Sequence, residues 1–407
     1  MVISFDALRA DGLGLYGSLR PTSPNLDAFG ARCLVFDRAY SAAPVTVTSF
    51  AAALSGELPF DVYADWKFEP RHATLGEVMR RAGFRTAAVF NNAQLTPERG
   101  FGRGFDDYVF HASVSDQRVV DSTAAWLGEH DEEPFFLWTH FIKPHGPYTP
   151  KRMSRHLVDQ DYDGEYAAGT PRVFDTDDPA VARHIRQLYD GEIFYADTMF
   201  GRLLDVLRER GRLNDTLILI TADHGEEFKE HGAYQHVHLY EETLRVPLLM
   251  YHPHLSRPRH VERLYSNVDL LPTLAAWVGV DPPPGLDGRD VLGPGEEPGA
   301  VVGVAMTDLA YRGFSMTRGD GKLILDLHPR VRRSMHLLDV DPGEQVDRRG
   351  SHGELTDALT EELWGAIGAT GARGVFRLRS ANASGPPPGR ADAVIEELRA
   401  LGYLSDD

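Results

Sequence analysis

The feature that most restricts the fold is a regular alternation of short apolar runs with longer stretches of helical periodicity. The predicted strands are residues 1–5, 86–90, 134–139, 216–221 and 246–251. The predicted helices are residues 24–32, 48–55, 74–82, 117–128, 181–210 and 268–279. Strands that are separated by helices form a parallel sheet with helices on both faces. We therefore predict an α/β fold, a large and mostly parallel sheet flanked by helices, with ligands at the carboxyl ends of the strands.

Proline- and glycine-rich stretches divide the chain into three parts. The first stretch, residues 281–285, precedes short predicted strands at 300–304, 312–318 and 321–327, and a hairpin turn at Arg318-Gly319-Asp320-Gly321 joins the last two. The second stretch, residues 381–390, precedes a last predicted helix at 391–401. The predicted parts are a large α/β domain over 1–295, a smaller domain over 296–380, and a linker with a C-terminal helix over 381–407.

Charge and composition exclude some classes of protein. The 407 residues carry a formal net charge of −18, and no basic patch stands out that would neutralise a nucleic acid. No window approaches the roughly 18 to 20 apolar residues of a membrane helix, and no signal peptide is visible. The sequence begins inside its first predicted strand, so an upstream segment stays open, and neither compartment nor oligomeric state is predicted. The single cysteine, Cys33, excludes an intrachain disulfide and is expected in the core.

Polar side chains directly follow two of the predicted strands. Asp6 follows the first strand, and Asp223 and His224 follow residues 216–221. Because the carboxyl ends of parallel strands lie at one edge of a sheet, we expect these three side chains to meet. Two carboxylates and an imidazole suit a divalent metal, and the imidazole favours zinc or manganese over calcium. The alternative is that Asp223 only caps a following helix.

A loop rich in hydroxyl groups runs into an apolar helix over residues 43–56, APVTVTSFAAALSG. Thr46, Thr48 or Ser49 could each cap this helix. Any of them could also be a nucleophile at the helix N-terminus, where the helix dipole stabilises an anion and a bound metal lowers the pKa of a hydroxyl. The pattern itself does not choose among the three.

Histidines near the predicted strand ends are candidates for acid–base chemistry. His145 lies in the segment HFIKPHGPY, which is expected to form a proline-stiffened turn after residues 134–139. A rigid turn at a strand end suits a general acid, whereas His140 in the same segment is expected to be structural. One of His236 and His238 is expected to face the site.

Two further positions are candidates for binding an anion. Asn91 and Asn92 end the strand predicted at 86–90, and either amide could donate to an oxyanion, although a strand-ending Asn is more often a turn residue. Arg9 could neutralise an anionic oxygen or pair with a carboxylate, and pairing is the commoner role of a lone Arg.

In their order along the chain, these motifs resemble the sulfatase family of the alkaline-phosphatase superfamily. The resemblance extends over nearly the whole chain. The matching segments are DALRAD at 6–11, LYG at 15–17, TSPNLD at 22–27, residues 43–56, GF at 100–101, GFD at 104–106, PHGPY at 144–148, YDGE at 189–192, TADHGEEFKEHG at 221–232, LYEETLRVP at 239–247, DLLPT at 269–273, GLDG at 285–288, DPGE at 341–344 and the ending at 398–404.

The resemblance implies an alkaline-phosphatase-like α/β domain followed by a smaller C-terminal domain built on an antiparallel sheet. The metal ligands and the nucleophile that it implies are Asp6, Asp223, His224 and Thr46. It also implies that His145 and His236 contact or protonate the ester, with His238 allowed by a one-residue uncertainty in the match. Arg9 and Asn91 complete the predicted catalytic set.

Three departures from the family pattern bear on the reaction. Sulfatases proper carry a Cys or Ser within a Cys/Ser-x-Pro-x-Arg motif that is converted to formylglycine. This chain has TVTSF at residues 46–50, and a threonine cannot become formylglycine. Many sulfatases have a second aspartate where this chain has Ala7, and the family's substrate-binding lysine near residue 91 is replaced by Asn91.

We predict a metal-dependent hydrolase of sulfate, phosphate or phosphonate esters that acts through Thr46 with one calcium, manganese or zinc ion. Chemistry favours phosphorus, because formylglycine hydrate releases sulfate by re-forming an aldehyde and a sulfated threonine has no such exit. The expected substrate is an anionic ester of a small molecule, glycan or lipid headgroup, and neither nucleic acid nor a membrane is expected as a partner. The alternatives are a phosphotransferase that resembles phosphoethanolamine transferases and a catalytically silent sulfatase homologue.

Overall fold

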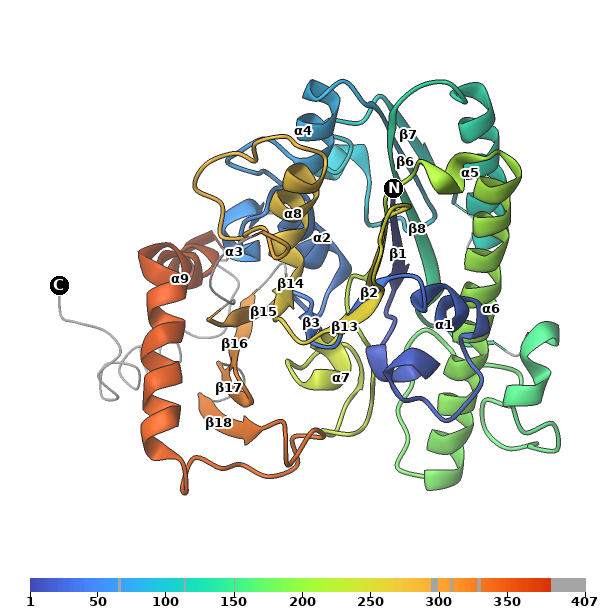
Figure 1. Cartoon of the computed structure of the whole chain (residues 1–407). Coiled ribbons are helices and arrows are strands. Elements are labelled where there is room, and N and C mark those ends of the chain that lie inside the picture. The colour runs from blue at the N-terminus through green and yellow to red at the C-terminus, as the bar shows by residue number, and fades with distance from the viewer. Residues whose placement is uncertain are drawn as a thin grey trace.

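A central sheet of eight strands organises the larger part of the molecule (Figure 1). The computed structural model describes residues 1–381 except 65–66, 113–114, 150, 294–298, 308–309 and 328–330. In spatial order the strands are β13 (Arg259–Val261), β2 (Leu34–Phe36), β12 (Leu248–Tyr251), β9 (Ile218–Ala222), β1 (Val2–Asp6), β8 (Phe135–Pro144), β6 (Arg85–Phe90) and β7 (Asp107–Phe110). Only β12 runs against its neighbours in this sheet, so the prediction of a mostly parallel sheet is confirmed.

Helices cover both faces of this sheet (Figure 1). One face carries α1 (Pro24–Gly30), α5 (Asp116–Glu129) and α6 (Pro179–Glu209). The other face carries α2 (Thr46–Ser55), α4 (Leu75–Arg81) and α8 (Leu270–Trp277).

Alternation along the strands decides which face each side chain meets, because successive residues of a strand point to opposite sides. In β1, Ile3 and Phe5 belong to the apolar core under α5 and α6, whereas Val2 belongs to the core under α2. Asp6 continues the series of Val2 and Ser4, and this places it on the face that carries α2.

A second sheet has four antiparallel strands, β15 (Val301–Thr307), β16 (Ala310–Arg318), β17 (Gly321–Asp326) and β18 (Arg332–Leu337). The predicted hairpin is present, with Arg318 opposite Gly321, and β18 is a strand that the sequence pattern missed. Helix α9 (Gly353–Ala381) packs on this sheet through Leu359, Leu363 and Ile367. The linker and helix predicted beyond residue 381 lie outside the described residues.

A buried lysine fastens the second sheet to the first part of the chain. Lys322 of β17 lies 2.9 Å from Glu241 Oε1 at the start of α7 (Glu241–Leu244) and 3.0 Å from Glu344 Oε1. The remaining short elements are α3 (Pro59–Val62) and the two-stranded pairs β3 (Ala39–Tyr40) with β14 (Tyr265–Ser266), β4 (Tyr63–Ala64) with β5 (Lys67–Phe68), and β10 (Glu227–Phe228) with β11 (Tyr234–Gln235).

Two of the boundaries that differ from the sequence-based prediction lie at the candidate site. Strand β8 continues to Pro144 and does not end at residue 139, because it keeps pairing with β1 through a register shift that sets Asp6 beside Pro144. His140 is therefore a strand residue and not part of a turn. Helix α2 begins at Thr46, its N-cap is Val45, and no side chain caps it.

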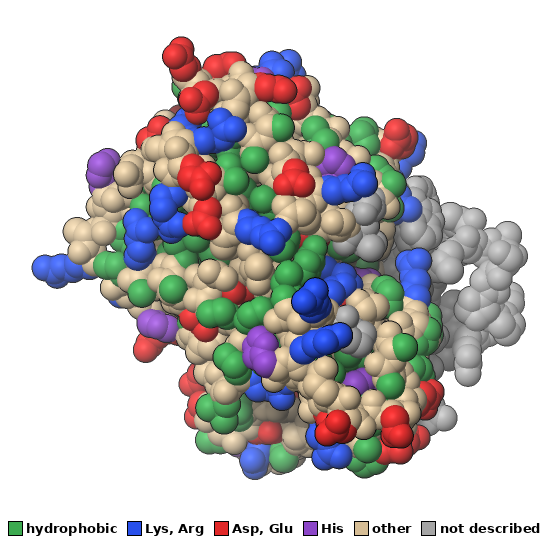
Figure 2. Space-filling model, turned by 90° about the vertical axis from the view of Figure 1, so that its right-hand side faces the viewer, with side chains coloured by type: hydrophobic (Ala, Val, Ile, Leu, Met, Phe, Trp, Pro, Cys, Tyr) green, Lys and Arg blue, Asp and Glu red, His purple; other side chains and the backbone are tan. Residues whose placement is uncertain are grey.

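The surface carries charges of both signs. On the side of the molecule drawn in Figure 2, acidic and basic side chains are interspersed, with hydrophobic side chains scattered between them. Cys33 is buried, as predicted. Among the described residues, no helix combines the length and the apolar character that crossing a membrane requires.

Candidate active site

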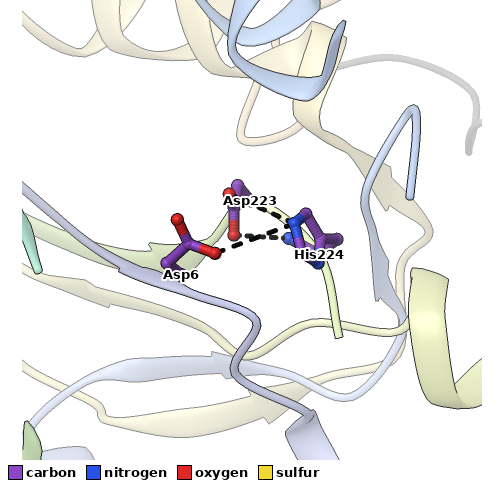
Figure 3. Close-up of side chains that lie close together, drawn as sticks. All are labelled: Asp6, Asp223 and His224. Carbon is purple, nitrogen blue, oxygen red and sulfur yellow. Dashed lines mark hydrogen bonds and ion pairs between the residues drawn. The ribbon is translucent and has the colours of Figure 1, made fainter. Parts of the chain in front are cut away.

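Asp6, Asp223 and His224 converge at the carboxyl ends of two central strands (Figure 3). Asp6 ends β1, and the other two residues follow β9, which pairs directly with β1. His224 Nε2 lies 3.8 Å from Asp6 Oδ1 and 3.5 Å from Asp223 Oδ2, and all three side chains are fully buried. The structure thus brings together the three residues that the sequence nominated as metal ligands.

The free acceptor atoms of this cluster fit a divalent cation. Asp6 Oδ1 and Asp223 Oδ2 are buried and accept no hydrogen bond. His224 Nδ1 donates its proton to the Gly225 carbonyl at 2.8 Å, so Nε2 turns its lone pair toward the carboxylates. Burial and the charge of Asp6 raise the pKa of Asp223 well above its ordinary value. A cation between these oxygens would offset both the burial cost and the repulsion of the two carboxylates.

Thr46 is the hydroxyl that lies at this cluster. Its Oγ1 is 3.4 Å from His224 Nε2, and its side chain also interacts with Asp223. The other two candidates are engaged elsewhere: Thr48 Oγ1 donates to the Val45 carbonyl, and Ser49 Oγ donates to the Asp223 carbonyl at 2.7 Å. As the candidate nucleophile, Thr46 is therefore favoured by the geometry over Thr48 and Ser49.

Ala7 directly follows Asp6 at the end of β1, and its backbone has the left-handed conformation, with φ of 60°. Its N–H donates to Asp223 Oδ1 at 3.1 Å, and the Tyr189 hydroxyl donates to its carbonyl at 2.8 Å. A non-glycine residue in this region is held there by its surroundings. The position at which many sulfatases have a second aspartate thus acts here through its backbone.

The asparagine that contacts the cluster is Asn92 and not Asn91, which corrects the choice made from sequence. Asn92 Nδ2 donates to Asp6 Oδ2 at 2.5 Å. Asn91 Nδ2 donates to Asp116 Oδ1 of α5 at 2.8 Å, and its Oδ1 accepts from the Ile142 N–H. The reason is strand alternation: Phe90 and Asn92 share the α2 face, so Asn91 points to the α5 face.

His140 supports Asp6 from β8. Trp138 Nε1 donates to Ser4 Oγ at 2.9 Å, and Ser4 Oγ lies 3.0 Å from His140 Nδ1. In the tautomer in which the Ser4 hydroxyl donates to Nδ1, the ring proton of His140 is on Nε2, which lies 3.5 Å from Asp6 Oδ2. Together with Asn92, His140 fixes the orientation of Asp6 and leaves its Oδ1 free.

Arg9 is bound to protein groups and is not free for a substrate. Its guanidinium lies 2.6 Å from both Asp11 Oδ2 and Glu230 Oε1, and it donates to the Glu226 carbonyl at 3.0 Å. These bonds tie the loop after β1 to the loop after β9. Of the two roles predicted for Arg9, the structure supports the ion pair and not the anion-binding catalytic role.

His145 and His236 lie beside the cluster. The ring centroid of His236 is 4.2 Å from that of His224 and 5.3 Å from that of His145. His236 Nδ1 is 3.1 Å from Glu226 Oε1, and the Tyr148 hydroxyl donates to Glu226 Oε2 at 2.7 Å. Burial lowers the pKa of His236, but the charge and hydrogen bond of Glu226 outweigh burial and raise this pKa above its ordinary value. Sequence reasoning did not single out Glu226 or Tyr148, because both contacts join distant loops.

His238 belongs to a different group, so the choice between His236 and His238 falls to His236. His238 Nδ1 lies 2.8 Å from Glu227 Oε2, and His231 Nδ1 lies 2.5 Å from Glu242 Oε1. Glu227, His231 and Glu242 have the spacing of a second metal site, but His231 is already paired with Glu242 and Glu227 with His238. We interpret the group as an ion-pair network that holds the loop after β9.

Asp116, the partner of Asn91, should make the stability depend on pH. Burial raises the pKa of Asp116 to about 7, and one of its oxygens has no partner. Between about pH 4 and pH 7 the folded state therefore binds one more proton than the unfolded state. As the pH rises through this range, the free energy of unfolding should fall by roughly 1.4 kcal/mol per pH unit because of this group. Asp116→Asn should lose this component, measured as the free energy of unfolding from pH 4 to 8. Parallel curves for the two proteins would contradict the assignment.

The fold and the site define a class of protein: an alkaline-phosphatase-like α/β fold with a polar cluster at the carboxyl edge of the sheet. Residues 1–280 match the family model described as Sulfatase. The chain belongs to the sulfatase family of the alkaline-phosphatase superfamily, a family of ester hydrolases.

Individual relatives agree with this assignment. A choline-sulfatase of Rhizobium meliloti is 27% identical over 330 residues, which cover 63% of this chain and 63% of that protein. An arylsulfatase of Clostridium perfringens is 22% identical over 71% of this chain and 76% of its own length. Among solved structures, the phosphonate monoester hydrolase of Agrobacterium radiobacter shares the fold with a TM-score of 0.75 at 19% identity, covering 90% of this chain and 94% of that one.

Proposed function

We propose that this chain is a metal-dependent hydrolase of monoanionic phosphorus esters, such as phosphodiesters or phosphonate monoesters, with Thr46 as the nucleophile. The observation that carries the proposal is the Thr46 hydroxyl, 3.4 Å from His224 Nε2 at the first residue of helix α2. A nucleophile there would lie beside the unpaired oxygens of Asp6 and Asp223, and the helix N-terminus would stabilise the anion that it attacks.

The identity of the nucleophile separates phosphorus from sulfur. A formylglycine hydrate expels sulfate by breaking its own C–O bond and re-forming the aldehyde, whereas a sulfated threonine carries no second hydroxyl for that route. A phosphorylated threonine can instead lose its group when water attacks phosphorus in line and the P–O bond to Thr46 breaks. The phosphonate monoester hydrolase that shares the fold makes such an ester a sensible first probe.

Asp6, Asp223 and His224 would hold the divalent ion, and Asn92 and His140 would keep Asp6 oriented toward it. Zinc and manganese suit this mixed nitrogen and oxygen donor set better than calcium. When bound, the ion would lower the pKa of the Thr46 hydroxyl and offset the negative charge of the ester.

The two histidines would have different tasks. His236 bonds a carboxylate, which favours its cationic form and suits it to stabilise the charge of the ester. His145 donates through Nδ1 to the neutral Gly146 carbonyl at 2.7 Å, and its Nε2 would be the atom that hands a proton to the ester. His145 would give this proton to the leaving oxygen and then take one from the attacking water.

Charge complementarity favours a monoanion over a dianion. Two carboxylates balance a divalent ion, and His236 adds one positive charge that is shared with Glu226. Arg9 and Lys143, basic side chains of the loops that carry the site, are both committed to protein groups. His145 loses its positive charge when it gives its proton to the leaving oxygen, so a phosphate monoester dianion would carry one negative charge more than the ion and His236 offset.

A parallel assay tests the proposal. Protein reconstituted with zinc or manganese is given an aryl phosphodiester, an aryl phosphonate monoester, an aryl phosphate and an aryl sulfate. The first two should turn over at least about tenfold faster than the last two. Preferred turnover of the aryl sulfate would contradict the proposal, and diversion of product to an added alcohol would favour the transferase alternative.

Substitution of the two histidines should give different patterns across leaving groups. His145→Ala should slow an ester with a phenol leaving group by about a hundredfold or more, and a p-nitrophenol ester far less, because only the poorer leaving group needs the proton. His236→Gln should slow both by similar factors, since it would remove a charge from the anion and not the proton. The measurement is kcat for the two esters with each variant, and a uniform loss in His145→Ala would reassign the acid.

A further inference from the structure

We propose that Lys143 is a positioning residue for His145, an inference that rests on the function proposed above. Lys143 is the penultimate residue of β8 and only 5% exposed. Its Nζ donates to the carbonyl of His145 at 3.1 Å and to that of Pro147 at 3.0 Å. One ammonium group therefore bridges two carbonyls of the loop that carries His145.

The backbone of His145 is fixed from both sides. Its N–H donates to the Asp6 carbonyl at 3.1 Å and to the Ile142 carbonyl at 3.0 Å, while Lys143 holds its carbonyl. The bond to Asp6 ties His145 to the strand end that supplies a carboxylate of the cluster. The two carbonyls that Lys143 holds, those of His145 and Pro147, lie on either side of the Gly146 carbonyl, which accepts from His145 Nδ1. Lys143 thus acts on both the place and the ring orientation of His145.

A buried carboxylate keeps Lys143 in place. Its Nζ lies 3.5 Å from Glu192 Oε1, a fully buried oxygen of α6 that also accepts from the Thr149 N–H at 2.8 Å. A lysine is costly to bury unless it is paired and hydrogen bonded. Its ammonium is bound on one side by Glu192 and on the other by the loop, so it cannot serve as a substrate cation.

The chain provides a matched control in Lys151. Its Nζ lies 3.4 Å from the same Glu192 oxygen and 2.9 Å from Thr149 Oγ1, whereas the two loop carbonyls accept from Lys143. Each of Lys151→Met and Lys143→Met removes one positive charge from beside the Glu192 carboxylate. Lys143→Met also removes the hydrogen bonds to the two loop carbonyls. A difference between these variants therefore reports on the His145 loop and not on the charge beside Glu192.

The test measures kcat for a phenyl and a p-nitrophenyl ester of the preferred class with the metal-loaded full chain. Lys143→Met should lose about tenfold or more on the phenyl ester and less than about threefold on the p-nitrophenyl ester, following His145→Ala in direction. Lys151→Met should lose less than about threefold on both. An equal loss on both esters, or no loss, in Lys143→Met would overturn the inference.

Two additions keep the result decisive. Lys143→Met removes one of the two cations beside the buried Glu192 carboxylate, so the double variant Lys143→Met/Glu192→Gln, in which the net charge is restored, should show the same dependence on the leaving group. The ring nitrogen resonances of His145 in protein labelled with nitrogen-15 at histidine should shift in Lys143→Met and not in Lys151→Met. If the unmodified protein cleaves none of the esters, the proposed function fails, and unchanged His145 resonances in Lys143→Met would overturn the positioning role independently.

Discussion

Thr46→Ala should lower turnover of the preferred ester by at least about a thousandfold, because it removes the oxygen to which the phosphorus group is transferred in the proposed mechanism. The fold should survive, since alanine suits the first turn of a helix that no side chain caps. Metal affinity should stay within about tenfold of the unmodified protein, as Asp6, Asp223 and His224 are all retained. The measurements are kcat on the preferred ester and metal affinity by titration.

Thr48→Ala is the matched control for this result. It makes the same substitution two residues later in α2, where the hydroxyl donates to the Val45 carbonyl and not to the cluster. Its turnover should stay within a few-fold of the unmodified protein. Equal losses in the two variants would show that the start of α2, and not the Thr46 hydroxyl, is what matters.

The second large effect is expected from Asp223→Asn, which should make the metal-free protein more stable and abolish most of its stabilisation by metal. Asp223 and Asp6 are buried carboxylates, each with an oxygen that lacks a hydrogen-bond donor. The Asn oxygen can still accept from the N–H groups of Ala7 and His224, which bond Asp223 Oδ1 at 3.1 and 2.8 Å. With chelator present, the variant should therefore be more stable by roughly 1 to 3 kcal/mol. It should also lose turnover and most of the stabilisation that added zinc or manganese gives the unmodified protein.

Thermal unfolding with chelator and with each metal ion measures how much the metal stabilises each protein. Asp269→Asn is the control, because Asp269 is also buried but accepts from the Ser266 and Arg289 N–H groups outside the cluster. That variant should keep the stabilisation by metal, whatever its own stability. A metal response retained in Asp223→Asn would contradict the ligand assignment.

The sequence was sufficient for the five central strands of the sheet and for the meeting of Asp6, Asp223 and His224, since both depend on local patterns, but it did not predict β2, β7 and β13. Apolar runs define the central strands, and a parallel sheet brings residues that follow strands to one edge. Strand alternation would also have separated Asn92 from Asn91, because Phe90 packs on the α2 face and the next residue must point to the other. The signal was present, but choosing between the asparagines required knowing which face carries the nucleophile helix.

Other parts of the site depend on contacts that no local pattern encodes. Pro144 suggested that the segment from His140 onward is a turn, whereas pairing with β1 extends β8 to that proline and makes His140 a partner of Asp6. Glu226 and His236 lie ten residues apart, and they meet because the loop after β9 folds back and brings its two ends together. The roles of Lys143 and Glu192 follow from the approach of α6 to the end of β8, a tertiary contact.

Trapping the covalent intermediate on Thr46 would decide whether this hydroxyl is the nucleophile. Metal-loaded protein is mixed with a p-nitrophenyl phosphonate monoester or phosphodiester, quenched in acid within one turnover, digested and analysed by mass spectrometry. The mass of the transferred phosphorus group should appear on the peptide that contains Thr46, localised to that residue and absent in Thr46→Ala. An adduct on Thr48 or Ser49, or turnover in Thr46→Ala at the rate of the unmodified protein, would contradict the proposed mechanism.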